Sequence, residues 1–126
     1  MITTQIFQYH CTNGTPTLID SNADPARAPD ELPDWPCSED RGIVVIYIKQ
    51  DGSSPIDATI EIDLSPAIIK GWKLYQMHTT RITNGGMIND RQTTIHLRQL
   101  EPHEHRRIDI LIKGPPGQIQ VSTTQQ

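Results

Sequence analysis

Residues 42 to 64 read GIVVIYIKQDGSSPIDATIEIDL, and this stretch decides the fold class. Apolar side chains occupy alternate positions in its second half: Ile56, Ala58, Ile60, Ile62 and Leu64. Such alternation predicts a β-strand with one buried face and one face in water. The first half, Gly42 to Lys49, leaves neither face polar and therefore predicts a strand that is covered on both sides. Asp51-Gly52 is typical of a hairpin turn, so we expect these two strands to pair.

Further segments are typical of strands, and turn residues separate them. These segments are residues 2–9, 15–19, 72–77, 81–83, 91–100 and 107–113, with Asn84-Gly85-Gly86 as a turn. Residues 118–126 are expected to form a last weak strand or an extended tail. The frequent isoleucine and threonine suit a pleated surface, and ten prolines and eight glycines favour turns over long regular elements.

The sequence therefore predicts an all-β domain over residues 1–126, an antiparallel β-sandwich of seven or eight short strands. We expect one long proline-rich loop at 20–41 and an extended tail at 114–126. Two sheets must share one core, because isolated hairpins are not stable. The alternation assigns eight side chains to that core: Ile46, Ile48, Ile60, Ile62, Ile95, Leu97, Ile108 and Ile110.

Two motifs carry a resemblance to a known family. ATIEIDLSP (58–66) followed by TTIHLRQLEPHEHRRIDILIKG (93–114) resembles the immunoglobulin-like repeat domains of prokaryotic surface proteins. The resemblance covers about residues 55–113, with Asp63-Leu64-Ser65-Pro66 displaced by one place and His103 where glycine is usual. It implies an immunoglobulin-like sandwich and a non-catalytic role.

The loop contains a stretch that scans as a calcium-binding loop, DSNADPARAPDE (20–31). Oxygen-bearing side chains occupy the first, third, fifth and twelfth places: Asp20, Asn22, Asp24 and Glu31. The sixth place requires a positive φ and usually holds glycine, whereas here it holds Pro25, and Arg27 places a cation nearby. We therefore predict a polar turn segment without an EF-hand site. A looser calcium site remains as the alternative, drawn from Asp20, Asp24, Asp30 and Glu31.

Histidines and cysteines offer two further candidate sites. His103 and His105 would share one face of a strand and could grip a metal with His10 and Cys11, but they fall in a predicted turn with no clear third ligand. We predict no metal site there. Cys11 and Cys37 are expected to be small buried thiols in a reducing compartment, with a single disulfide as the alternative.

Trp35 lies in the proline-stiffened segment ELPDWPC (31–37). A stiff segment loses little entropy on docking, and tryptophan is enriched among interface anchors. We predict a partner-binding site at Pro33, Asp34, Trp35 and Pro36. The alternative is that Trp35 closes one end of its own sandwich.

Composition argues against several classes of protein. The net charge is −4 and Arg106-Arg107 is the densest basic pair, which disfavours nucleic-acid binding. The first residues lack the features of a secretory signal, and no stretch approaches the ~20 apolar residues that span a bilayer. We expect a chain made in the cytoplasm, without membrane contact, whose final location is unknown and could be a virion or similar particle.

Three functions remain at this point. The first is a non-catalytic structural or interaction subunit of a larger assembly, such as a virion, with protein partners or self-association and no cofactor. The second is a carbohydrate- or calcium-binding module that acts through residues 20–41. The third, an enzyme with Cys37 or a metal at its centre, is disfavoured because no base and orienting group accompany a nucleophile.

Overall fold

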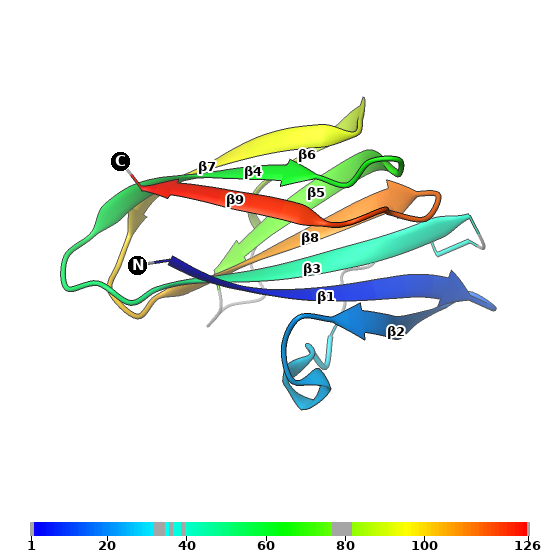
Figure 1. Ribbon diagram of the computed structural model, residues 1–126, viewed down its shortest axis with the longest axis horizontal. Coiled ribbons are helices and arrows are strands. Elements are labelled where there is room, and N and C mark those ends of the chain that lie inside the picture. The colour runs from blue at the N-terminus through cyan, green and yellow to red at the C-terminus, as the bar shows by residue number, and fades with distance from the viewer. Residues whose placement is uncertain (1, 32–34, 36, 39, 77–81, 126) are drawn as a thin grey trace.

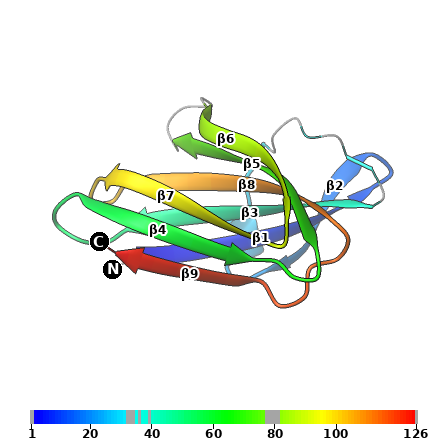
Figure 2. The same cartoon turned by 90° about the horizontal axis from the view of Figure 1, so that it is seen from above.

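The computed structural model describes residues 2–31, 35, 37–38, 40–76 and 82–125. These residues form strands and one short 3-10 helix: β1 (Ile2–Thr12), β2 (Thr15–Ser21), η1 (Pro25–Arg27), β3 (Arg41–Gln50), β4 (Ile56–Asp63), β5 (Ile68–Gln76), β6 (Ile82–Asp90), β7 (Gln92–Leu100), β8 (His105–Lys113) and β9 (Gln120–Gln125). The strands make two antiparallel sheets that pack face to face (Figures 1 and 2). The predicted all-β class and two-sheet packing are confirmed.

The two sheets differ in size and in what covers them. The larger has the strand order β2-β1-β3-β8-β5-β6, and the smaller has the order β7-β4-β9. All strand pairings among the described residues are antiparallel. Between the sheets lies one large apolar core, and the eight predicted core side chains all belong to it, none more than 2% exposed. The alternation in the sequence therefore identified the inner faces correctly.

The central strand β3 has a second buried face, on the outside of the larger sheet. Phe7, Tyr9, Ile43, Val45 and Leu111 form a separate apolar cluster there. Leu18 of β2 and three side chains of the long loop pack against this cluster: Ala23, Ala28 and Trp35. The sequence predicted that this strand is covered on both sides, and β2 and the loop of the same chain contribute the second cover.

The predicted pairing of the two strands in residues 42–64 is wrong. β3 pairs with β1 and β8, whereas β4 pairs with β7 and β9 in the other sheet. The physical reason is the covering that each strand needs. β3 is apolar on both faces and lies in the sheet that is covered on both sides, whereas β4 has one polar face and lies in the sheet that is open to water. The segment around Asp51-Gly52 therefore crosses between sheets.

The predicted turn at Asn84-Gly85-Gly86 is also wrong, because these residues lie inside β6. Gly85 stands opposite Lys73, and a Cβ atom there would lie only 2.8 Å from the carbonyl oxygen of Trp72. This glycine therefore allows two backbones to approach closely within a strand, and it does not mark a turn. The chain then passes from β6 in the larger sheet to β7 in the smaller one.

The expected tail at 114–126 contains a true strand. Gln120 to Gln125 form β9, which pairs with β4 over six consecutive residues, from Asp63↔Gln120 to Ala58↔Gln125. The chain itself thus holds this segment, by pairing it with β4. The two chain ends lie at the same end of the sandwich in both views (Figures 1 and 2).

Candidate interaction surface

The outer face of the larger sheet carries a row of polar and aromatic side chains below the loop. The registers of β3, β8 and β5 place Tyr47, Arg107 and Tyr75 side by side. The next row on the same face contains Val45, Asp109 and Lys73. Charged side chains thus enter a face that is otherwise apolar on β1 and β3, and the loop covers part of them.

Arg107 and Asp109 form a buried, two-point ion pair. Arg107 Nε donates to Asp109 Oδ1 and Nη2 donates to Oδ2, both at 2.7 Å. The Asp109 side chain has no exposed area and that of Arg107 is 16% exposed. Burial raises the pKa of the Asp109 carboxyl, and the hydrogen bonds from Arg107 oppose this effect. Since both charges are removed from water, each needs the other to compensate its lost hydration.

The same guanidinium fastens the loop to the sheet. Arg107 Nη2 also donates to the backbone carbonyl oxygen of Glu31, at 2.6 Å. The Arg107 guanidinium carbon lies 5.4 Å from the centroid of the Tyr75 ring, which is a cation–π distance. One side chain of β8 therefore connects β5, its own strand and the middle of the loop.

Trp35 is the second contact between loop and sheet. Its ring lies beneath the Lys73 ammonium, with 4.1 Å between Nζ and the ring centroid. Its Cη2 atom lies 3.2 Å from the position that a Cβ of Gly71 would take, so the missing side chain of Gly71 makes room for the indole. Trp35 Nε1 and the hydroxyl of Tyr9 are buried, and neither has a hydrogen-bond partner among the described residues. Trp35 is thus half-buried against the outer face of its own larger sheet, not at an end of the sandwich.

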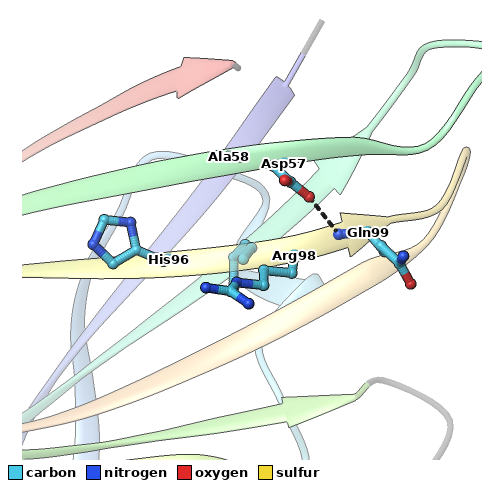
Figure 3. Close-up of a pocket in the computed structure, with 6 residues that line it drawn as sticks. Asp57, Ala58, His96, Arg98 and Gln99 are labelled. Atoms are coloured by element: carbon cyan, nitrogen blue, oxygen red, sulfur yellow. Dashed lines mark hydrogen bonds between the residues drawn. The ribbon is translucent and has the colours of Figure 1, made fainter.

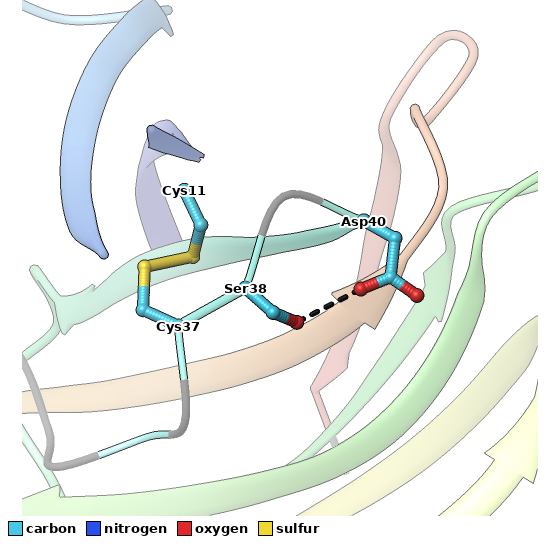
Figure 4. Close-up of a disulfide and its surroundings, with 4 residues drawn as sticks. All are labelled: Cys11, Cys37, Ser38 and Asp40. Carbon is cyan, nitrogen blue, oxygen red and sulfur yellow. Dashed lines mark hydrogen bonds between the residues drawn. A yellow bond between two sulfur atoms is a disulfide. The ribbon is translucent and has the colours of Figure 1, made fainter. Parts of the chain in front are cut away.

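A disulfide is the third contact and corrects the prediction of free thiols. Cys11 of β1 and Cys37 of the loop are bonded, with their Cα atoms 5.4 Å apart (Figure 4). Beyond it, Ser38 Oγ donates to Asp40 Oδ1 at 2.8 Å, and the chain enters β3. The sequence could not give this proximity, because it depends on how the loop returns across β1. A bonded Cys37 is not available as a nucleophile.

Two side-chain oxygens of the calcium-like stretch accept hydrogen bonds from the backbone of the same chain. Asn22 Oδ1 accepts from the backbone N–H of Ile6, at 2.6 Å. Asp24 Oδ1 accepts from the N–H of Ala26 and caps η1, which begins at Pro25. Proline is favoured at such a first position because its φ is fixed and it lacks an N–H. Pro25, which occupies the place of the EF-hand glycine, therefore begins a helical turn.

The histidine motif lies in the turn that precedes β8. His103 has a φ of 61°, and Glu104 accepts hydrogen bonds from the N–H of Glu101 and from Nε of Arg106, both at 2.7 Å. His105 begins β8. In the described part of the chain, no three His, Cys, Asp or Glu side chains come together to hold a metal ion.

The smaller sheet carries an open hollow of about 730 Å³ on its side (Figure 3). It is lined by Asp57, Ala58, His96, Leu97, Arg98 and Gln99. Asp57 Oδ1 accepts from the N–H of Gln99 at 2.9 Å, which holds Gln99 at a φ of 51° beside a register irregularity in the β4–β7 pairing. The Asp57 carboxylate is therefore engaged in fixing a bulge.

The structure brings together only part of the predicted site. Trp35 is placed on the sheet, whereas Pro33, Asp34 and Pro36 lie outside the described residues. The sequence reading missed Lys73, Arg107 and Asp109. A signal for the last two was present, because Arg107 and Asp109 share one face of a strand whose other face is isoleucine.

Comparison of the chain with protein-family models, with curated proteins and with solved structures found no match. Among the described residues, no helix has the length and apolar character that crossing a membrane requires.

Proposed function

We propose that this chain is a non-catalytic interaction subunit of a larger assembly, and that it docks a protein partner with the loop surface, defined as residues 20–41. The observation that carries the proposal is the threefold attachment of the loop to the larger sheet. The attachment points are the Cys11–Cys37 disulfide, the hydrogen bond from Arg107 to Glu31, and Trp35 below Lys73. The described residues of the loop, 20–31, 35, 37–38 and 40–41, thus present a preformed surface.

A preformed surface supports a binding role for energetic reasons. Ordering a free loop on binding costs conformational entropy, and a loop that is already fixed avoids much of that cost. The loop's outward side chains are exposed, among them Asp24, Arg27, Asp30 and Glu31. Loops longer than about 12–15 residues are uncommon in compact domains and are usually either functional or linker segments. We retain Pro33, Asp34, Trp35 and Pro36 as proposed contacts, with Trp35 in the additional role of positioning the segment.

Charge indicates the chemistry of the partner. Residues 20–41 contain seven acidic and two basic side chains, hence a net charge of −5 in a chain whose total is −4. A surface of one sign favours a partner surface of the opposite sign and excludes partners of the same sign. We therefore propose a partner with a lysine- or arginine-rich patch. The immunoglobulin-like resemblance belongs to the same proposal, since domains of that kind serve as non-catalytic modules.

Neutralising the loop tests the proposal. The tagged full chain, its Asp30→Asn/Glu31→Gln variant and a Glu61→Gln/Asp90→Asn control, which removes two exposed carboxylates elsewhere, are each purified from the native source. The mass of the complex and its protein content are then measured. We expect one stoichiometric partner with the wild-type chain and the control, and at least tenfold less of it with the loop variant, because each charge contact at an interface is worth about 1–2 kcal/mol. Equal recovery with all three chains contradicts the proposal.

The calcium- and carbohydrate-binding alternative gains no specific support. The side-chain oxygens of Asn22 and Asp24 already accept hydrogen bonds from the backbone of the same chain. A calcium ion would have to replace these bonds.

A further inference from the structure

The described sheets end in four edge strands: β2 and β6 on the larger sheet, β7 and β9 on the smaller. An edge strand exposes unpaired backbone N–H and C=O groups, which form a template for another strand. Proteins usually block such an edge with charge, proline or a bulge. An edge that lacks this protection is therefore a candidate site for pairing with a further strand.

Three of the four edges are protected. β2 carries Pro16 and Asp20, and its pairing with β1 has a register irregularity at Gln8/Tyr9. β6 ends in Asp90, and its pairing with β5 has two irregularities. β7 carries Arg98 and the bulge that holds Gln99 at positive φ. Each of these edges would present a charge or a kink to an incoming strand.

β9 has none of these devices. Its sequence QVSTTQ lacks charged residues, proline and glycine. It pairs with β4 in an unbroken register from Gln120 to Gln125. Its six residues are enough for a strand of ordinary length. Among the described edges it is therefore the one that is straight, uncharged and free to pair.

The start of β9 lies close to the larger sheet. Ile6 of β1, Asp20 and Ser21 of β2 and Ile119, which precedes β9, line one hollow, and the two chain ends lie close together in both views (Figures 1 and 2). β2 pairs with β1 only from Phe7 onward. The first residues of β1, 2–5, therefore pair with β3 and not with β2.

We propose that β9 pairs antiparallel with β9 of a second copy of this chain, so that two three-stranded sheets become one continuous six-stranded sheet. A twofold interface brings identical surfaces together, and an edge without charge meets its own copy without repulsion. Serine, threonine and glutamine side chains suit such cross-strand contacts. This proposal rests on the proposed function in one respect: the β9–β9 pairing would supply a contact between copies of the chain in the larger assembly.

The exposure pattern of β9 gives the register. Val121 and Thr123 are half-buried on the inner face, whereas Gln120, Ser122 and Thr124 are exposed on the outer face. Directly opposed residues of two antiparallel strands share a face, so the twofold axis must pass through one residue. An axis at Ser122 places Val121 opposite Thr123 twice, and β-branched pairs are favourable. An axis at Thr123 would instead place Val121 opposite the exposed Gln125, so we assign the axis to Ser122.

A single introduced thiol tests this register in the purified full chain. In the described residues both native cysteines are in the disulfide, so an introduced cysteine is the one free thiol there. Ser122→Cys places two thiols opposite each other across the axis, with Cα atoms about 4.5–5.5 Å apart. Thr124→Cys places them four residues apart along the strands, at about 13 Å. We expect mild oxidation to give a 122–122 linked dimer at least about tenfold faster for Ser122→Cys.

A charge at the same place gives a second readout. Ser122 and Thr94 flank Glu61 on the exposed face, one on β9 and one on β7. Ser122→Lys puts two like charges in contact across the axis and is expected to convert the dimer to monomer in sedimentation, whereas Thr94→Lys is expected to leave it unchanged. Both variants should fold and show a cooperative melting transition, because both positions are exposed.

Three results would overturn the proposal: a monomeric wild-type chain at high concentration, equal cross-linking at 122 and 124, or equal effects of the two lysines. A dimer formed by exchange of β9 would also overturn it, because residue 122 would then face Glu61 of the other copy and no 122–122 link would form. These measurements use the chain alone, without a partner. A negative result here therefore does not contradict the proposal that the loop binds a partner. Likewise, a failure to find that partner does not contradict the β9–β9 pairing.

Discussion

Arg107 and Asp109 stand two residues apart on one face of β8 and join their side chains by two hydrogen bonds of 2.7 Å. Asp109 is fully buried and Arg107 largely so, and Arg107 also binds the loop through the carbonyl oxygen of Glu31. A buried pair of this kind adds little stability compared with apolar residues of the same size. Removing only one of the two side chains is strongly destabilising, because the other charge then remains buried without a partner.

The pair therefore predicts a strongly non-additive mutant cycle. Asp109→Leu leaves the Arg107 guanidinium buried without a counterion and is expected to lower the free energy of unfolding by about 3–5 kcal/mol. Arg107→Met/Asp109→Leu removes both charges and is expected to recover most of that loss. Urea denaturation of the two variants and of Arg107→Met completes the cycle. A double variant that is as unstable as the sum of the single variants contradicts this account.

The disulfide predicts where stability is lost on reduction. Cys11 and Cys37 are 26 residues apart in sequence, and closing a loop of that length removes entropy worth about 3.5 kcal/mol from the unfolded chain. We expect Cys11→Ser/Cys37→Ser to lose about this amount. Hydrogen exchange should rise in residues 22–30 and stay slow in β3 and β8. Two titratable thiols in the untreated native protein would contradict the bond itself.

How far the sequence predicted the fold depends on whether a feature was local. The alternation in residues 56–64 identified β4 and its inner face, because side-chain direction in a strand follows from the sequence alone. The partner of β4 did not follow, since strand pairing is a long-range choice. Asp51-Gly52 has the local chemistry of a hairpin, but the covering of each sheet decided the pairing instead.

The candidate surface was predicted in outline only. Trp35 stood out as a tryptophan among prolines, and the need of β3 for a second cover was readable from its apolar run. The contacts that fix Trp35 come from Gly71 and Lys73, which are distant in sequence and look unremarkable in it. Asn84-Gly85-Gly86 misled for the opposite reason, because close backbone approach and turn formation both select glycine.

Calcium is expected to leave the protein unchanged. A ligand that binds only the native state raises the melting temperature, and the rise grows with the logarithm of the ligand concentration above its Kd. Because Asn22 and Asp24 already accept backbone hydrogen bonds, we expect no rise in melting temperature at millimolar calcium. Magnesium at equal ionic strength is the control. A calcium-specific rise that disappears in Asp20→Ala would reverse this interpretation.

Glu104 predicts an acid-sensitive contribution to stability. Burial acts to raise the pKa of its carboxyl, but the hydrogen bonds from Arg106 and from the N–H of Glu101 outweigh it, so the pKa lies below the usual 4.5. A folded-state pKa below the unfolded one stabilises the protein above pH 4.5, and this stabilisation is lost as the pH falls through the folded value. At pH 7 we expect Glu104→Gln to cost about 1.5–3 kcal/mol.

The pH dependence distinguishes this effect from a general loss of packing. The difference in free energy of unfolding between wild type and Glu104→Gln should shrink steadily below pH 4.5, as urea titrations at each pH can measure. Glu61→Gln, which removes an exposed carboxylate from β4, is the matched control. A difference that stays constant down to pH 3 would assign the loss to side-chain shape instead of charge.

Gly71 predicts a displacement of Trp35. A Cβ at this position would lie 2.9 Å from Met87 Sδ, 3.2 Å from the carbonyl oxygen of Gly86 and 3.2 Å from Trp35 Cη2. Since Met87 is flexible and exposed, it can move aside, whereas the indole is held between Lys73 and the sheet. We expect Gly71→Ala to cost about 1–3 kcal/mol and to push the ring outward. In a Trp72→Phe background, the fluorescence of Trp35 should shift to the red and be quenched more readily by acrylamide.

Gly86→Ala is the control, because its Cβ would meet no atom closer than 4.0 Å. Since alanine leaves the unfolded chain fewer conformations than glycine, this change should be neutral or slightly stabilising. Unchanged Trp35 fluorescence in Gly71→Ala would mean that the indole does not occupy the space this glycine leaves.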